Sequence, residues 1–189
     1  RATDRAAHIA REQGLPLHLL HVIHGNLLDD MKAWLDNSGL WQIRMSQLTR
    51  KRLDDEVMRL MTELGGDLIL LTQQVDGQPV PEICEQAAAV EAGLVVVGAR
   101  GTNPLHHLLI GTTAERLLGK TAVPLLVVRT EATARYQRVL VPLDFSPWSE
   151  HALAVAHAAA PGAHLVLMHS FSIPFEEKLR FAGVDDATL

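Results

Sequence analysis

The sequence predicts an α/β protein with a doubly wound, open parallel sheet. Its 189 residues, of which 48% are hydrophobic and 21% charged, suffice for one domain with a substantial core and part of another. Short apolar runs alternate with segments of helical periodicity, and glycine or proline separates them. This alternation favours parallel strands joined by right-handed crossovers, with helices on both faces of the sheet.

The first helix and strand are expected at the start of the sequence. Alanine and isoleucine recur on one side of residues 3–13, and Gly14 ends this helix. The apolar run 17–23 is typical of a buried strand. Asn26 is expected to cap a further helix, which stops before Gly39.

The next elements follow the same alternation. Apolar residues from Leu53 to Leu64 recur at spacings of three and four, as in a helix. Pro79 opens the next helix, and Thr112 with Glu115 has the spacing of a capping box at the start of another. The strands expected between and after these helices are 67–75, 94–97 and 123–128.

A second strand–helix–strand pattern begins after a segment with no strong apolar periodicity. We expect a first domain at 1–130, a linker at 131–137 and the start of a second domain at 138–189. Within the second domain, residues 138–146 are expected to form a strand and a turn. A helix and the strand 164–171 then follow.

The helix and last strand of this second part repeat those at the start of the chain. Thr3 aligns with Ser149, and after a slip of two residues His21 aligns with His169. In this register the first copy lacks its opening strand, and the second copy stops after its second strand.

Glycines gather where the strand 94–97 leads towards the helix at Thr112. Ligands bind beyond the carboxyl ends of strands in open parallel sheets, and Gly98 and Gly101 would let the backbone turn and approach a ligand. The helix start offers N–H groups that suit phosphate, and Arg100 could add a contact. The alternative is a turning loop before a capped helix, since neither the Walker lysine motif nor GxGxxG occurs.

Composition argues against several classes of partner. The formal net charge of −5 disfavours a nucleic-acid surface. No apolar run approaches the roughly 20 residues of a membrane helix. The lone cysteine, Cys84, cannot form an internal disulfide. We therefore expect a cytoplasmic protein without nucleic-acid or membrane partners.

Catalytic and metal sites are weaker interpretations of the sequence. A zinc site needs three or four converging ligands, whereas His21 and His169 are more simply explained as packing residues. Ser146, His151 and Asp144 offer the residue types of a hydrolytic triad, but no nucleophile-elbow motif GxSxG occurs. We expect no metal site and no catalytic residues.

The spacing Gly98–x2–Gly101–x9–Gly111–Thr112 resembles the nucleotide-binding motif of the universal stress protein family, in the subgroup that binds ATP. The stretches LHLLHVI, GLVVVGARG, GTTAERLLGKTAVPLLVV and RVLVPLDFS resemble successive family segments, so the resemblance covers nearly the whole chain. The repeat makes the chain similar to tandem members, which carry two such domains.

This resemblance implies which residues bind the nucleotide. In the second copy, Asp144 would accept a hydrogen bond from the nucleoside. Leu143 departs from the family, which commonly has a hydroxyl residue there. Asp144 also lies in the other copy from the glycine loop. The implied site residues are Val22, Val75, Gly77, Val97, Gly98, Arg100, Gly101, Gly111, Thr112, Thr113, Pro142, Leu143 and Asp144.

The resemblance also implies the strand order 3-2-1-4-5 and a regulatory role for ATP, bound with magnesium, in the stress response. The strand 123–128 would be the sheet edge and would join a homodimer or the two copies of a tandem protein. No general base or nucleophile is evident, so the chain is expected not to be an enzyme beyond slow, incidental hydrolysis. The alternatives are a non-nucleotide interaction protein on the same fold and an ATP phosphohydrolase.

The opening strand missing from the first copy would be the central strand of this order. Without it, backbone groups on both sides stay unpaired. We expect the sequence to be part of a longer two-domain protein. The alternatives are exchange of residues 138–143 between two chains, and their insertion within one chain. The short linker disfavours insertion within one chain, because a connection between parallel strands of one sheet needs a dozen or more residues.

Overall fold

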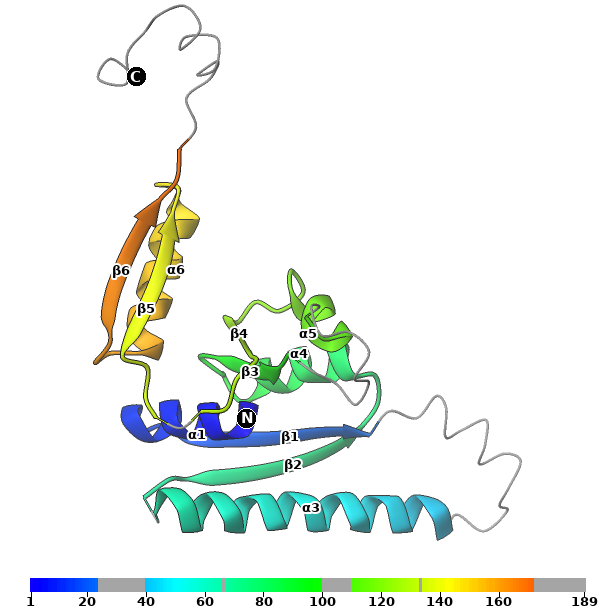
Figure 1. The fold of residues 1–189 in the computed structure, drawn as a ribbon. Helices are drawn as coiled ribbons and strands as arrows, with labels where there is room; N and C mark the ends of the chain where they lie inside the picture. Colours follow the sequence, from blue (N-terminus) through cyan, green and yellow to red (C-terminus); the bar gives the residue numbers. More distant parts are fainter. Residues whose placement is uncertain (24–39, 66, 100–109, 133, 172–189) are drawn as a thin grey trace, which may run out of the picture. The chain divides into compact units, whose positions relative to one another are not determined.

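The computed structural model describes residues 1–23, 40–65, 67–99, 110–132 and 134–171 (Figure 1). The chain divides into two compact units, Arg1–Arg135 and Tyr136–Leu189, and the division falls within the predicted linker.

Unit 1 alternates helices and strands, as the sequence predicts. Helix α3 begins well before the predicted helix at Leu53–Leu64, and the helix expected after Asn26 lies outside the described residues. The elements in chain order are α1 (Ala2–Gln13), β1 (Leu17–Ile23), α3 (Leu40–Leu64), β2 (Leu70–Asp76), α4 (Pro79–Ala89), β3 (Val95–Gly98), α5 (Thr112–Leu117) and β4 (Leu125–Val128).

The strands of unit 1 form separate two-stranded parallel sheets. β1 pairs with β2 from Leu17 opposite Leu70, and β3 pairs with β4 from Val95 opposite Leu125. Parallel pairing is confirmed. In the predicted order 3-2-1-4-5 the missing opening strand is strand 1. β1 and β2 then correspond to strands 2 and 3, and β3 and β4 to strands 4 and 5. No described ladder joins the two pairs. The single five-stranded sheet therefore stays a prediction.

Helix α1 ends where the sequence requires a left-handed residue. Gly14 has φ 64°, a conformation that glycine adopts without steric cost. The N–H groups of Gly14 and Leu15 donate to the carbonyls of Arg11 and Ala10 at 3.3 and 2.9 Å. These bonds satisfy carbonyl groups at the helix end and turn the chain into β1.

The core of unit 1 lies against the alanine face of α1. Because alanine is small, α1 can approach α3 and the strands closely. The buried members are Ala6, Ala7, Ala10, Leu17, Leu60 and Leu68, and the partly buried Leu19, Leu64, Leu70 and Val96 pack against them. Since Val96 belongs to β3, the cluster connects both sheets of unit 1 through α1.

Arg59 adds a polar contact between α3 and α1. Its guanidinium lies 2.5 Å from Asp4, 2.7 Å from Glu56 and 2.6 Å from Glu63. The hydrogen bonds from Arg59 lower the pKa of Glu56 more than its partial burial raises that pKa. Partly exposed ion pairs contribute about 1 kcal/mol or less each, so the apolar contact dominates.

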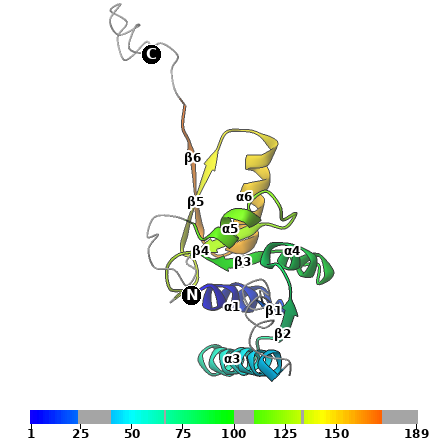
Figure 2. The same cartoon turned by 90° about the vertical axis from the view of Figure 1, so that its right-hand side faces the viewer.

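Unit 2 is a β–α–β unit made of β5 (Arg138–Leu143), α6 (Pro147–Ala159) and β6 (His164–His169). β5 pairs with β6 in parallel, and α6 lies along one face of the pair (Figure 2). Ser146 caps α6, since its hydroxyl accepts from the Ser149 N–H at 3.3 Å. The ladder described for β5 is the one with β6.

Replacing Leu60 with alanine tests the core between α1 and α3. The Leu60 side chain is 1% exposed, so Leu60→Ala should lower the free energy of unfolding by about 2–5 kcal/mol through lost burial and an unfilled cavity. Met61→Ala, at a 40% exposed neighbour, should change it by about 0.5 kcal/mol or less. Urea denaturation measures both variants, and equal losses would contradict the packing described.

Candidate functional site

The first group of predicted site residues lies at the carboxyl ends of β1 and β2. Val22 and Val75 are opposite each other in the ladder, and both are half-buried. The Gly77 N–H donates to the Ile23 carbonyl at 3.0 Å, which continues the pairing one residue beyond the strands. The structure therefore brings Val22, Val75 and Gly77 together at the carboxyl ends of β1 and β2.

Gly77 also lets the start of α4 close on this strand end. Its φ is 156°, and a Cβ added there would lie 2.5 Å from Glu82 Oε1 and 2.8 Å from Glu82 Cγ. Glu82 is in the first turn of α4. A side chain at residue 77 would therefore push Glu82 away from the strand ends at Val22 and Val75.

The second group lies where β3 ends and α5 begins. The Gly111 N–H donates to the Ala99 carbonyl at 2.8 Å, and the Ala99 N–H donates to the Val128 carbonyl at 2.8 Å. These bonds join the two ends of the glycine-rich loop and fix one of them to β4. The middle of the loop, including Arg100 and Gly101, lies outside the described residues.

The start of α5 differs from the predicted capping box. Gly111 is the N-cap residue, without a side-chain capping bond, and Thr112 is the first residue of the helix. The Glu115 N–H donates to the Gly111 carbonyl at 2.9 Å. The capping role predicted for Thr112 was wrong, because Gly111 already supplies the extended residue before the helix. Thr112 and Thr113 are exposed in the first turn.

Val97 and Gly98 complete this second group. They are the last two residues of β3 and lie opposite Val127 and Val128 of β4. Val97 is half-buried and Gly98 is exposed, so the strand reaches the surface where the glycine-rich loop begins. The predicted positions at both described ends of the loop are thus adjacent.

The third group belongs to unit 2. Pro142 and Leu143 are the last two residues of β5, and Asp144 directly follows the strand. Asp144 Oδ1 accepts from the Ser146 hydroxyl at 2.6 Å and from the Ser146 N–H at 2.9 Å. These bonds, the hydroxyl bond first, lower the pKa of Asp144 to about 2. Asp144 is exposed, so an ionised acceptor faces solvent at neutral pH.

Aromatic rings beside Asp144 were not indicated by any sequence motif. The ring centroid of Phe145 lies 4.6 Å from that of His169, which lies 6.2 Å from that of Phe171. Phe145 is 73% exposed and has φ 61°, which is unusual for a bulky residue. His169 Nδ1 lies 2.7 Å from the Leu143 carbonyl oxygen. In the sequence, only the alignment of His169 with His21 in the internal repeat pointed to a member of this aromatic cluster.

The described residues also bear on a histidine site, a metal site and a membrane-spanning helix. Partial desolvation and the nearby positive charge of Arg52 lower the pKa of His21 below its ordinary value. Within the described ranges, no cluster of three or more His, Cys, Asp or Glu residues could hold a metal ion. None of the helices described is long and apolar enough to cross a membrane.

These features define an α/β protein whose candidate site residues lie at glycine-bearing strand ends and at the start of a helix. A sequence profile of the universal stress protein family matches residues 1–129. The chain therefore belongs to the universal stress protein family.

Several curated proteins are similar to the chain. A universal stress protein of Mycobacterium tuberculosis is 28% identical over 181 residues, which are 90% of this chain and 58% of the relative. One of Methanocaldococcus jannaschii is 28% identical over 130 residues, which are 68% of this chain and 73% of the relative. The chain thus spans 58% of the length of the mycobacterial relative.

Solved structures support the same fold. A universal stress protein from Archaeoglobus fulgidus has a TM-score of 0.63 at 22% identity, covering 94% of this chain and 64% of the other. A universal stress protein in complex with cAMP has a TM-score of 0.51 at 22% identity, covering 69% and 88%. At this level of identity the likeness establishes the fold alone.

Removing the Ser146 hydroxyl tests the environment of Asp144. Ser146→Ala should raise the pKa of Asp144 from about 2 towards its ordinary 3.8, because the 2.6 Å hydrogen bond from the Ser146 hydroxyl is lost. Since the folded pKa is the lower one, ionised Asp144 stabilises unit 2 above pH 3.8, and this contribution is lost as pH falls through about 2.

Carboxyl-carbon NMR titration measures this pKa directly. Thr62→Ala, which removes an exposed hydroxyl of α3 in unit 1, is the control and should leave the titration midpoint of Asp144 unchanged. A midpoint near 2 in the Ser146→Ala variant would contradict the assignment.

Proposed function

We propose that this chain binds an adenine nucleotide, ATP with magnesium, as a regulatory ligand in the stress response. The observation that carries the proposal is the Ala99–Gly111 hydrogen bond, which joins the ends of the glycine-rich loop at the start of α5. The family member solved in complex with cAMP supports an adenine nucleotide as the class of ligand.

The phosphates are assigned to the loop and the first turn of α5. Backbone N–H groups at the start of a helix suit phosphate, and the exposed hydroxyls of Thr112 and Thr113 can donate beside them. Gly98 and Gly111 have no side chain to keep phosphate oxygens from the backbone. Arg100 and Gly101 are assigned to the same group from the family motif.

The base and ribose are assigned to the strand ends. Val97 is assigned to the ribose. The half-buried Val22 and Val75, at the carboxyl ends of β1 and β2, offer apolar contact to the base, and Gly77 lies beside them. The hydrogen bond from the Gly77 N–H to the Ile23 carbonyl holds Gly77 beside the end of β1.

Unit 2 carries residues that could contact the nucleoside of a second nucleotide. Pro142 and Leu143 lead to Asp144, whose ionised carboxylate can accept from a nucleoside hydroxyl or amine. The exposed Phe145 ring lies beside it, and stacking of a base on an aromatic side chain contributes about 1–3 kcal/mol. We assign these residues to a second, tandem copy of the domain.

The nucleotide is proposed to be held rather than turned over. A general base works best with a pKa near the working pH, whereas Asp144 titrates at about 2. Hydrolysis by this chain is therefore expected to be slow and incidental. A reducing location, the cytoplasm, fits the free thiol of Cys84.

Calorimetry on a glycine variant tests nucleotide binding. Gly111→Val should weaken binding of ATP with magnesium at least about tenfold, a loss of about 1.4 kcal/mol, because a branched side chain blocks close approach of the phosphates. Gly93→Val is the matched control, since a Cβ at Gly93 meets no atom within 4 Å. Unchanged ATP affinity in the Gly111→Val variant would overturn the site.

We also propose that β4 joins two chains, or the two copies of a tandem protein. β3 is the one described strand that pairs with β4, and residues Leu125–Val128 are all apolar. Val127→Arg should shift the assembly to a smaller species in light scattering, because a charge opposes apolar edge pairing. Leu118→Arg, at a 51% exposed position outside the strand, should not. Monomers in both wild type and Val127→Arg would contradict this proposal.

A further inference from the structure

His169, the last residue of β6, contacts the turn that joins β5 to α6. It lies opposite Leu143, the last residue of β5, in the parallel ladder. Its Nδ1 atom lies 2.7 Å from the Leu143 carbonyl oxygen. Because a carbonyl oxygen only accepts, this hydrogen bond requires a hydrogen on Nδ1. A side chain of β6 thus holds the backbone directly before Asp144.

The same ring also contacts the residue directly after Asp144. The ring centroids of His169 and Phe145 lie 4.6 Å apart, with 51° between the ring planes. This is the range of favourable tilted aromatic pairs. Phe145 has φ 61°, a conformation that bulky residues rarely adopt and that persists where surrounding contacts hold it. His169 supplies such a contact, so one side chain holds the turn on both sides of Asp144.

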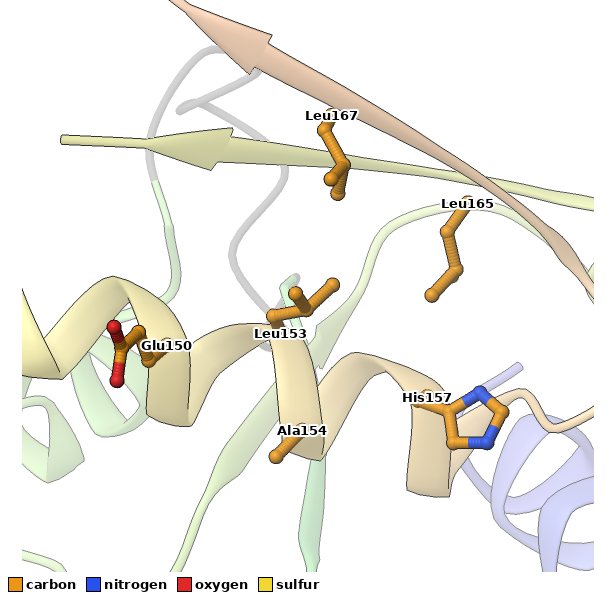
Figure 3. A pocket seen from close by; sticks show the side chains of 6 residues that line it. All are labelled: Glu150, Leu153, Ala154, His157, Leu165 and Leu167. Atoms are coloured by element: carbon orange, nitrogen blue, oxygen red, sulfur yellow. The ribbon is translucent and has the colours of Figure 1, made fainter. Parts of the chain in front are cut away.

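The direction of the His169 side chain follows from the pleat of β6. Side chains alternate between the two faces of a strand, so Leu165, Leu167 and His169 share one face. Figure 3 shows that Leu165 and Leu167 lie across from Leu153 of α6. Because β5 and β6 are parallel, the carboxyl end of β6 lies beside the turn at which α6 begins. His169 therefore continues the row that faces α6 and reaches that turn.

The hydrogen bonds of Asp144 depend on the direction of the backbone in this turn. Asp144 Oδ1 accepts from the Ser146 hydroxyl at 2.6 Å and from the Ser146 N–H at 2.9 Å. Both bonds span two residues, with Phe145 between the partners. Rotation of the backbone at Leu143 or Phe145 would separate the carboxylate from Ser146 and let water replace the bonds.

The internal repeat carries histidine at this strand position in both copies. His21 of β1 aligns with His169 of β6. In unit 2 this position lies opposite the end of the opening strand. Both copies thus carry a ring nitrogen donor at the position that holds the residue before Asp144.

We infer that His169 is a positioning residue for Asp144, which it holds through a hydrogen bond to the Leu143 carbonyl and a ring contact with Phe145. That the carboxylate meets a nucleoside rests on the proposed function. The role of His169 within the turn rests on these contacts alone, and it requires no contact between His169 and the ligand.

Ring ¹⁵N NMR of the full chain tests the hydrogen bond without any substitution. In the neutral ring of His169 the hydrogen should be on Nδ1, because the Leu143 carbonyl accepts it there. A neutral ring with its hydrogen on Nε2 would overturn the inference.

Two substitutions separate the donor of His169 from its ring. His169→Phe keeps a ring and loses the donor, whereas His169→Asn keeps an N–H donor at the place of Nδ1. Carboxyl-carbon NMR should show the pKa of Asp144 rising from about 2 towards 3.8 in the His169→Phe variant. The His169→Asn variant should retain most of the lowered pKa. His164→Asn, at the exposed start of β6, is the control and should leave this pKa unchanged.

The titration distinguishes positioning of Asp144 from a role in strand packing alone. Loss of packing would lower the free energy of unfolding and leave the pKa of Asp144 in the folded chain at about 2. An unchanged pKa in the His169→Phe variant, or an equal rise in both variants, would overturn the inference. No nucleotide is used in either experiment, so a chain that fails to bind ATP would overturn the proposed function and not the role of His169.

Discussion

Burial of the alanine face of α1 is the interaction on which unit 1 depends. Ala7 and Leu60 are 0% and 1% exposed, and Val96 of β3 packs against the same cluster. Apolar burial contributes about 25 cal/mol per Å², whereas the partly exposed ion pairs of Arg59 contribute little each. Because α1 contacts both two-stranded sheets, it supports both strand ends that carry predicted site residues of unit 1.

Most described elements of the fold could be predicted from the sequence. The apolar runs at β1, β3 and β4 and the helical pattern of α1 are strong local signals, and Gly14 and Pro79 mark element ends. The prediction missed the start of α3 at Leu40, although Trp41, Met45 and Leu48 already recur at helical spacings of four and three. The pairing of whole sheets depends on contacts distant in sequence, so the order 3-2-1-4-5 rested on family resemblance alone.

The candidate site was predictable in part. The glycine spacing identified both described ends of the loop, and the structure joins them through Ala99 and Gly111. Thr112 was assigned a capping role because its spacing to Glu115 fits the motif, yet the preceding glycine takes that place. The Phe145 ring reaches the His169 ring only when β5 and β6 pair, and a local motif cannot reveal such a contact.

The joined loop ends at β3 and α5 are proposed to receive the phosphates of an adenine nucleotide. Amide NMR of the ¹⁵N-labelled chain, titrated with ATP and magnesium, tests it most directly. We expect saturable shifts at the amides of Gly98, Ala99, Gly111 and Thr112, with the amide of His157 on α6 as an unaffected internal reference. Absence of shifts at these four amides at saturating ATP, or shifts confined to other parts of the chain, would contradict it.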